Sequence, residues 1–348
     1  MIEGRAFLLF SQNSTTQPAY RSEGRFTPAS FVTPDLDGSD AQHTLVPETT
    51  LKLPAFAKIN LGLRVLGKRE DSYHELRTIF QTISLHDTIE FTNDPRIALS
   101  CDDRSLPTGA ENLVYRAAEA LQKRFAPRTG ARIRLEKRIP AQAGLGGGAS
   151  DAAVTLLALN HLWNLEANRN DLLEIASSLG ADVPFFLFGG TARGTGIGHK
   201  ITPLPETAEK FLLIIKPNAN ISTELAYQSL NSGSLTSTEA KTILSSSQPV
   251  EIFGSFDPEA LQNDFERMVF ELAPEIERAK IALMNNGAEA ARLAGSGSAV
   301  FGVFDSKNAQ ERAIQAIALE AGWRVFPCRT VGRNDYRSAM GDLFRLWD

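Results

Sequence analysis

The sequence predicts an α+β fold built from two domains. Stretches with strand-like alternation and stretches with helical spacing follow one another from about Leu51 to about Met340, and several neighbouring strands carry hairpin signals. This pattern favours an α+β arrangement over a doubly wound parallel sheet. A length of 348 residues is enough for two ordinary domains, and we expect their boundary near residue 200.

Composition excludes several classes of protein. The chain is 43% hydrophobic and 22% charged, which is typical of a soluble globular protein. A net charge of −5 without a long basic run argues against a general nucleic-acid binder. Cys101 and Cys328 are too few for a disulfide framework or a cysteine metal site. No apolar stretch approaches the roughly 18–20 residues of a membrane span, so we expect a cytoplasmic protein.

Residues 1–50 differ from the rest of the chain. They are rich in Ser, Thr, Pro and Gln and lack apolar periodicity, so they bury too little apolar surface to offset the entropy of ordering. We predict a disordered N-terminal extension. Its apolar run, Ala6–Phe10, is too short for a secretory signal, whereas an organellar transit peptide remains a weaker alternative.

The first half of the folded region alternates short strands with helices. Residues 57–65 alternate apolar and polar side chains as a half-buried strand does, and 111–125 has helical spacing. Asn170 or Asp171 is a candidate N-cap for a later helix. The other elements predicted here are strands at 78–84, 87–91 and 132–139 and helices at 151–165 and 171–179.

The same rhythm restarts after Lys200. Apolar alternation and helical spacing again follow one another, separated by a long loop rich in Ser and Thr. The elements predicted here are strands at 211–215, 299–304 and 323–329, helices at 223–230 and 307–321, a largely helical region at 259–286 and the loop at 232–250.

A glycine-rich loop carries the strongest chemical signal. Gly144 and 146–148 supply four glycines in five positions, directly before a predicted helix. Glycines let the backbone come close to a ligand, and a helix N-terminus with free N–H groups favours an anion. A plain turn with Ser150 or Asp151 as helix cap is the alternative. Because four glycines exceed what capping needs, we predict a phosphate site.

Other phosphate-binding motifs fit this loop less well. A Walker loop needs a lysine after the glycines, and none follows here. Gly144-x-Gly146-x-x-Ala149 matches the dinucleotide fingerprint literally, but the acidic residue that would bind a ribose about twenty positions later is missing. The lysine and catalytic-loop motifs of protein kinases are also missing. An oxidoreductase that uses NAD remains a third-ranked alternative.

Five segments, in order, resemble the GHMP kinases, which phosphorylate small alcohols. The glycine loop, 140–150, resembles the second motif of that superfamily. The set as a whole is similar to the member whose alcohol substrate carries a cytidine diphosphate group, in the non-mevalonate isoprenoid pathway. The resemblance covers about 51–340, and residues 1–50 have no counterpart. The four narrower segments are Ala57-Lys-Ile-Asn-Leu61, Ser72-Tyr-His-Glu-Leu76, Gly180-Ala-Asp-Val-Pro184 and Leu293-Ala-Gly-Ser-Gly297.

The resemblance implies a two-domain GHMP-kinase fold with the active site between the domains. The implied ATP-binding N-terminal domain, 51–200, is ribosomal protein S5 domain 2-like, and the implied C-terminal domain, 201–340, is ferredoxin-like. The implied cofactors are ATP and Mg²⁺, without a dedicated protein metal site. We expect no nucleic-acid or membrane partner, and a monomer or weak homodimer.

The resemblance assigns the catalytic pair to Lys58 and Asp182. Phosphoryl transfer needs positioning, charge neutralisation and removal of the hydroxyl proton. Asp182 would accept that proton as general base, and Lys58 would orient it and favour the developing alkoxide. From the residues alone, a turn aspartate and a solvated strand lysine would be the simpler interpretations. Asp151, nearer the glycines, is the competing acid and stays a candidate metal or loop residue.

The same resemblance supplies two sets of binding residues. Tyr73 and Tyr227 would stack on cytosine and His74 would bind its edge. A core aromatic at Tyr227 and a plain tight turn at 295–297 stay alternatives. The residues implied for ATP are Asn112, Leu113, Pro140, Ala141, Gln142, Ala143, Gly144, Leu145, Gly146, Gly147, Gly148, Ala149 and Ser150. Those implied for the second substrate are Asn60, Tyr73, His74, Thr223, Tyr227, Gly295, Ser296 and Gly297.

Two other functions stay open at this level. One is another kinase of the superfamily, acting on homoserine, mevalonate or a sugar, although a small acyclic alcohol does not need the aromatic clamp of Tyr73 and Tyr227. The other is a nucleotide-binding protein without transfer activity, against which the presence of both Lys58 and Asp182 argues.

Overall fold

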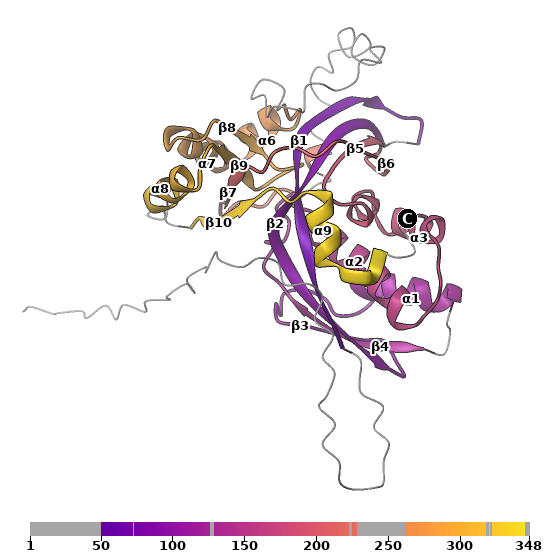
Figure 1. The fold of residues 1–348 in the computed structure, drawn as a ribbon. Helices are drawn as coiled ribbons and strands as arrows, with labels where there is room; N and C mark the ends of the chain where they lie inside the picture. The colour runs from indigo at the N-terminus through magenta and orange to yellow at the C-terminus, as the bar shows by residue number, and fades with distance from the viewer. Residues whose placement is uncertain are drawn as a thin grey trace, which may run out of the picture.

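The computed structural model describes residues 50–71, 73–125, 129–222, 225–227, 262–317, 320 and 322–344. The disordered extension predicted for residues 1–50 lies, except for Thr50, outside these described residues, as do the loop predicted at 232–250 and the implied substrate residue Thr223. The described chain forms two sheets, each with its own helices, that meet along a shared apolar face (Figure 1).

The larger sheet has six strands and is organised by one long antiparallel pair. β1 (Thr50–Lys68) pairs with β2 (His74–Asp94) along its whole length. The remaining strands flank β2, in the order β3-β4-β2-β5-β6. Their bounds are Ala98–Cys101 for β3, Gly130–Glu136 for β4, Thr191–Gly196 for β5 and Lys200–Pro203 for β6.

One long strand stands where the sequence predicts two. The segments 78–84 and 87–91 are both part of β2, so the predicted break between them is wrong. The pairing register shifts between Phe56 and Ala57, where β2 carries extra residues opposite β1. Such a bulge interrupts the alternation of apolar and polar side chains without ending the strand.

Helices cover one face of the larger sheet. α2 (Gly147–Leu162) lies in the middle of this layer, and every residue from Ser150 to Asn160 is buried. α1 (Leu113–Phe125), α3 (Arg169–Leu179) and the 3-10 helix η1 (Val183–Leu187) all pack against it (Figure 1). A helix that is apolar on all sides fits this central place.

The N-cap of α3 is Asn168, so the predicted cap at Asn170 or Asp171 is wrong. The Asn168 side chain accepts hydrogen bonds from the backbone N–H groups of Asn170 and Asp171. The Asp171 carboxylate accepts one from the N–H of Asn168 in return. This reciprocal arrangement is a capping box, which satisfies N–H groups that have no partner within the helix.

The smaller sheet is antiparallel, with the strand order β10-β7-β9-β8. Its helices pack on one face, and they follow the first and third strands in chain order. This is the ferredoxin-like arrangement, so the predicted fold of the second domain is confirmed. The strands are β7 (Phe211–Lys216), β8 (Ala290–Leu293), β9 (Val300–Phe304) and β10 (Arg324–Arg329), and the helices are α6 (Glu266–Leu272), α7 (Pro274–Asn285) and α8 (Lys307–Ile317).

The two sheets share a third apolar cluster. Leu212, Ile214 and Phe301 of the smaller sheet pack with Ile59 and Ile83 of the larger one. Burial of apolar area on both faces stabilises this junction by roughly 25 cal/mol per Å² removed from water. Near this junction the turn after β8 approaches the middle of β1, since a Cβ atom on Gly295 would lie 3.3 Å from the Asn60 Oδ1.

The end of the described chain returns to the larger sheet. α9 (Arg333–Ala339) and the 3-10 helix η3 (Gly341–Phe344) bury Tyr336 and Phe344 in the core below α2. The Tyr336 hydroxyl donates a hydrogen bond to the carbonyl oxygen of Phe186. Because β6 also pairs in the larger sheet, the range 201–340 contains segments that pack with the first domain.

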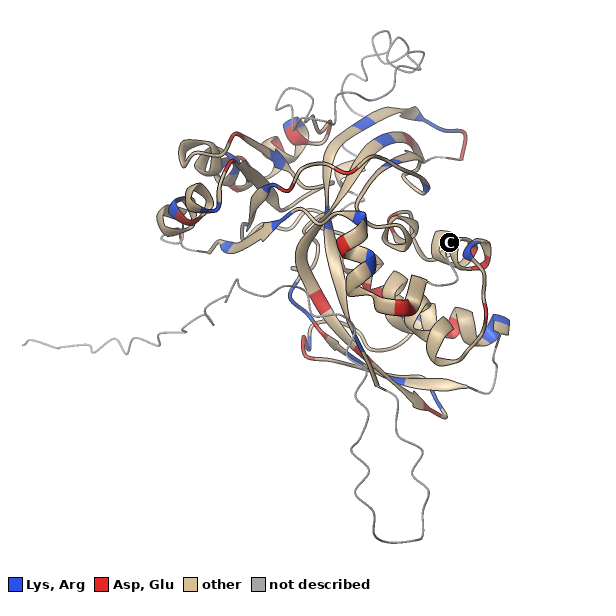
Figure 2. Cartoon of the chain, in the orientation of Figure 1, with Lys and Arg blue, Asp and Glu red and all other residues tan. Residues whose placement is uncertain are grey.

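Charged residues of both signs are interspersed over the helices and strands (Figure 2). None of the helices in the described ranges combines the length and the apolar character needed to cross a lipid bilayer. Interspersed charge of this kind keeps a surface hydrated without producing a strong field of one sign.

Candidate active site

A cavity of about 930 Å³ lies between the glycine loop, β1 and the segment that carries Tyr227. Its lining brings together Lys58, Asp182, His74 and Tyr227 with the glycines at 144 and 146–148. These residues come from both halves of the chain. The fold therefore brings the segments named in the sequence analysis together around one cavity, which has both polar and apolar side chains in its lining.

The glycine loop is itself the start of α2. The helix begins at Gly147 with Gly146 as its N-cap, so the prediction that it begins at Asp151 is wrong. Gly144 and Gly146 have φ angles of 76° and 72°, in the left-handed region that glycine tolerates. The first N–H groups of a helix have no partner within it. They open here into the cavity, where an anion would bind to them.

Space around the loop also requires glycine. A Cβ atom on Gly146 would lie 2.9 Å from the Phe186 ring and 3.1 Å from Lys58. One on Gly144 would overlap the carbonyl oxygen of Ala294. These glycines therefore allow close packing of the loop as well as access for a ligand. The glycine pattern in the sequence did not distinguish between these two reasons for glycine.

Most of the residues expected to bind ATP line the cavity. The structure places 140–149 along it, together with Asn112 and Leu113 at the start of α1. The Asn112 carboxamide is already used, since it donates to the Pro107 carbonyl at 2.7 Å and accepts from the Val114 N–H at 2.9 Å. Ser150 differs, because it is fully buried and is not part of the cavity lining.

Lys58 and Asp182 form an ion pair at the wall of this cavity. The Lys58 Nζ lies 3.3 Å from an Asp182 carboxylate oxygen. The Lys58 side chain is 4% exposed, whereas the Asp182 side chain is 37% exposed. Asp182 is the residue before η1 and lies at its N-terminal end. The pair is anchored on its lysine side and open on its carboxylate side.

A chain of hydrogen bonds fixes Lys58 in place. Its Nζ donates to the Asn60 Oδ1 at 2.8 Å, and the Asn60 Nδ2 donates to the Thr78 hydroxyl at 2.7 Å. The Thr78 hydroxyl donates in turn to the Gly62 carbonyl at 2.8 Å. Asn60 thus serves Lys58 directly. Thr78 was not predicted as a site residue. The pairing of its strand, β2, with β1 could have indicated that it lies beside Asn60.

Aromatic side chains form the other end of the cavity. Tyr73 is 61% exposed, whereas His74 is buried. The His74 and Tyr227 rings lie 5.3 Å apart at 30°, and Tyr227 meets Phe265 edge-on. Burial, and secondarily the charge of Asp182, raises the pKa of the Tyr227 hydroxyl well above its usual range. Tyr227 and the ion pair line the same cavity.

The second glycine turn packs against the first. The Ser298 N–H donates to the Gln142 carbonyl at 3.3 Å, and the Ala299 N–H donates to the Ala143 carbonyl at 3.1 Å. Gly295 and Ser296 line the cavity. The turn thus packs against the glycine loop and also reaches the cavity, although Gly297, the third residue expected to bind the substrate, is not part of the lining.

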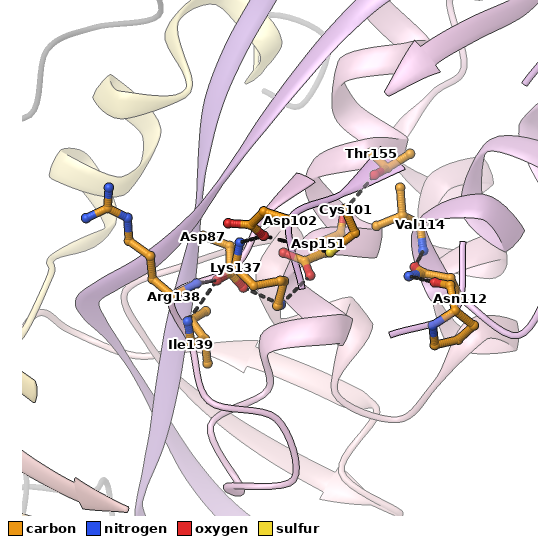
Figure 3. A network of polar contacts seen from close by, with 11 residues as sticks. Asp87, Cys101, Asp102, Asn112, Val114, Lys137, Arg138, Ile139, Asp151 and Thr155 are labelled. Atoms are coloured by element: carbon orange, nitrogen blue, oxygen red, sulfur yellow. Dashed lines mark hydrogen bonds and ion pairs between the residues drawn. The ribbon is translucent and has the colours of Figure 1, made fainter. Parts of the chain in front are cut away.

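Asp151 lies in a second, buried cluster (Figure 3). Asp151 and Lys137 of this cluster line the same cavity as Lys58 and Asp182. The Lys137 Nζ lies 2.7 Å from the Asp151 carboxylate and 2.5 Å from that of Asp87. Asp87 also accepts the N–H groups of Arg138 and Ile139 at 2.5 and 2.8 Å. We call Asp87, Lys137 and Asp151 the buried cluster. Sequence reasoning missed Asp87 and Lys137, which are widely separated in the chain.

Burial dominates the charge states of this cluster. It raises the pKa of Asp151 to about 8, although Lys137 opposes the shift. Burial lowers the pKa of Lys137, but the two carboxylates raise it further, to a value above its usual range. One Asp151 oxygen is bound to Lys137, whereas its Oδ1 has no hydrogen-bond partner and the residue lines the cavity. Its role as a metal or loop residue stays a prediction.

No group of three His, Cys, Asp or Glu side chains in the described residues could hold a metal ion. Mg²⁺ in phosphoryl-transfer sites is held mainly by phosphate oxygens and water, with one or two carboxylates. The half-exposed Asp182 beside the loop fits that requirement for a nucleotide-bound ion.

Two family models match the chain. That of the GHMP kinases N terminal domain matches residues 112–190, and that of the GHMP kinases C terminal matches residues 249–322. Among curated relatives, the 4-diphosphocytidyl-2-C-methyl-D-erythritol kinase of Syntrophus aciditrophicus is 40% identical over 81% of this chain and 99% of its own length. The kinase of that name from Solibacter usitatus is 43% identical over 82% and 90%.

Solved structures give the same result. A crystal structure of 4-(cytidine 5'-diphospho)-2C-methyl-D-erythritol kinase aligns with a TM-score of 0.64 at 36% identity, over 81% of this chain and 99% of its own. Homoserine kinase from Cytophaga hutchinsonii aligns with a TM-score of 0.66 at 20% identity, over 84% and 98%. At that identity the likeness concerns the fold alone.

Proposed function

The chain belongs to the 4-diphosphocytidyl-2-C-methyl-D-erythritol kinase family of the GHMP kinases, and we propose that it phosphorylates the 2-hydroxyl of that substrate in the cavity between its two sheets. It is an ATP-dependent small-molecule kinase of the non-mevalonate route to isoprenoids. The proposal adds which residues carry out the reaction. A cytoplasmic monomer or weak homodimer stays a prediction of the sequence.

The start of α2 would hold the phosphates of the donor. The N–H groups at Gly147 and Gly148 have no partner within the helix, and the positive end of the helix dipole adds to their attraction for an anion. ATP supplies the transferable phosphoryl group when it is bound there. The walls at 106–107 and 112–113 leave an apolar side for its base.

Asp182 would act as the general base. Its carboxylate is half-exposed to the cavity, so an incoming hydroxyl can approach within hydrogen-bond distance and give up its proton. Lys58 holds that carboxylate at 3.3 Å and is itself fixed by Asn60. A fixed ammonium beside the reacting oxygen stabilises the charge that develops there. Asp182 would also help to hold a nucleotide-bound Mg²⁺, which would supply neutralisation of the phosphate charge.

The aromatic end of the cavity would bind the cytidine group. Tyr73 and Tyr227 offer ring faces, and His74 offers ring nitrogens beside Tyr227. Stacking on aromatic rings recognises a base, and hydrogen bonds to its edge identify which base it is. This end lies on the same cavity as the ion pair, so a long substrate could reach from the rings to Asp182.

One observation supports this assignment above the others: Lys58 and Asp182 face the cavity into which α2 begins. The test is a mass-spectrometric assay for one added phosphate, with ATP and Mg²⁺, on 4-diphosphocytidyl-2-C-methyl-D-erythritol, mevalonate and homoserine in parallel. We expect addition to the first compound and little to the others. Preference for mevalonate or homoserine would overturn the substrate, and ATP binding without any product would overturn the activity.

A further inference from the structure

A short segment joins the two halves of the molecule beside the ion pair. Residues 262–266, which we call the clip, lie between β1 of the larger sheet and the turn at 294–297 that follows β8. These residues lie in the stretch 259–286 that the sequence predicts to be largely helical. They contact both sides of the cavity wall through hydrogen bonds from backbone and side chains.

On one side the clip pairs with β1. The Leu63 N–H donates to the Gln262 carbonyl at 2.8 Å, and the Asp264 N–H donates to the Leu63 carbonyl at 3.0 Å. The Asp264 carboxylate accepts the Val65 N–H at 2.8 Å and pairs with Arg64 at 2.9 Å. The clip is thus fixed to the strand that carries Lys58.

On the other side a single buried carboxamide holds the turn. The Asn263 Nδ2 donates to the Leu293 carbonyl at 3.0 Å and to the Gly295 carbonyl at 2.7 Å. Its Oδ1 accepts the Phe265 N–H at 3.0 Å. A carboxamide offers two donors and an acceptor on one small group, so all of its hydrogen-bonding capacity except one lone pair is used. Glu266 adds a bond from the Leu293 N–H at 2.8 Å.

The turn that Asn263 holds lies directly against the catalytic lysine. A Cβ atom on Gly295 would lie 3.3 Å from both the Lys58 Nζ and the Asn60 Oδ1, and 3.0 Å from the Gly144 carbonyl oxygen. The turn therefore packs close to these groups, with little more room than a glycine needs. A displacement of the turn towards them would move Lys58, Asn60 or the glycine loop.

We propose that Asn263 is a positioning residue for phosphoryl transfer, which fixes the turn at 294–297 against Lys58 and so sets the place of the ion pair. The proposal rests on the proposed function, in which Lys58 and Asp182 act together. Asn263 touches neither substrate. It acts through Gly295, and a displacement of about 1 Å at a reacting group costs on the order of 10²-fold in rate.

The test is Asn263→Asp. This change keeps the acceptor that binds the Phe265 N–H and removes both donors that reach the turn. We expect kcat to fall by about 10- to 100-fold, while KM for 4-diphosphocytidyl-2-C-methyl-D-erythritol stays within about twofold. A lower folded fraction alone would also reduce the apparent kcat at unchanged KM, so kcat is expressed per folded enzyme, with the folded fraction taken from circular dichroism. A merely structural role would then leave kcat unchanged. Asn286→Asp is the matched control, since Asn286 donates to the Ala282 carbonyl at 2.8 Å at the end of α7.

Full kcat in folded Asn263→Asp, or a raised KM with unchanged kcat, would overturn the proposal. If that variant does not fold, Asn263→Ser decides on the same readouts, because a hydroxyl has one donor hydrogen and cannot bind both the Leu293 and the Gly295 carbonyls. A fall in kcat then supports the proposal and unchanged kcat overturns it. The two proposals fail differently: a wild-type chain without transfer overturns the proposed function, whereas an active wild type with an equally active variant overturns only the role of Asn263.

Discussion

The glycine loop lies between two lysine–aspartate clusters that differ in exposure. Lys58 and Asp182 form a simple pair with a half-exposed carboxylate at the cavity. In the buried cluster, Lys137 lies between Asp87 and Asp151, whose side chains are 0% and 3% exposed. The two clusters use the same residue types beside the same loop, so residue type alone does not separate their roles.

Exposure and hydrogen bonding do separate them. Asp87 accepts two backbone N–H groups just before the loop, and Lys137 joins that segment to the first turns of α2. A sealed carboxylate with these partners holds structure, whereas an open one can receive a hydroxyl proton. We therefore expect changes at the first pair to affect turnover and changes in the buried cluster to affect stability.

Apart from loss of the base itself, the largest expected effect is on turnover in Lys58→Met. Removal of the ammonium beside the reacting oxygen should lower kcat by about 10²–10³-fold, measured by steady-state assay, with little change in the free energy of unfolding. Lys52→Met is the matched control, because Lys52 lies earlier on β1 in an exposed pair with Glu90. If Lys58→Met were as active as Lys52→Met, the pair of Lys58 and Asp182 would have no special role in turnover.

Asp87→Ala should show the reverse pattern, with its main effect on stability. Loss of one partner from a buried ion pair costs about 3–5 kcal/mol, which a urea denaturation series would measure. Glu90→Ala on the same strand removes a partly exposed partner and should cost at most about 1 kcal/mol. If the two variants unfolded at the same urea concentration, the buried cluster would have no structural role.

Tyr73→Ala should affect binding at the far end of the cavity. Stacking of one base on an aromatic ring contributes about 1–3 kcal/mol, so KM for the cytidine-bearing substrate should rise roughly 5- to 150-fold. Tyr73→Phe keeps the ring and should stay close to the wild-type KM. An unchanged KM in Tyr73→Ala would mean that this exposed ring does not contact the base.

The last expected effect is a pH dependence of stability that comes from Asp151. Burial raises its pKa to about 8, whereas in the unfolded chain it is about 3.9. The stabilisation from the protonated form is therefore complete below about pH 4 and is lost as pH rises towards and through 8. Relative to Asp151→Asn, the wild type should lose stability between pH 5 and pH 8. Parallel unfolding curves at the two pH values would contradict this.

Part of this architecture is predictable from local sequence patterns. Glycines at 144–148 indicate a phosphate loop, and the alternation around Lys58 indicates its strand, because both signals lie within a few neighbouring residues. The second sheet follows the expected ferredoxin-like order. The start of α2 was misplaced because glycine has low helix propensity, and here packing of the loop overrides that preference.

What the sequence could not supply depends on contacts between distant segments. Lys137 meets Asp87 only because β4 pairs with β2, and Asn263 meets Gly295 only because α6 follows a bridge to β1. Neither of these two contacts produces a pattern among neighbouring residues of the sequence. The resemblance favoured Asp182 over Asp151, and the difference in exposure between the two carboxylates depends on the whole layer of helices over the sheet.

The most direct test compares Asp182→Asn with Asp151→Asn in single-turnover phosphoryl transfer, with the ATP dissociation constant measured for each variant. If the open pair performs the chemistry, Asp182→Asn should lose about 10²–10⁴-fold in rate while it binds ATP normally, and Asp151→Asn should stay within a few-fold of the wild-type rate. A normal rate in Asp182→Asn together with a collapsed rate in Asp151→Asn would contradict the account.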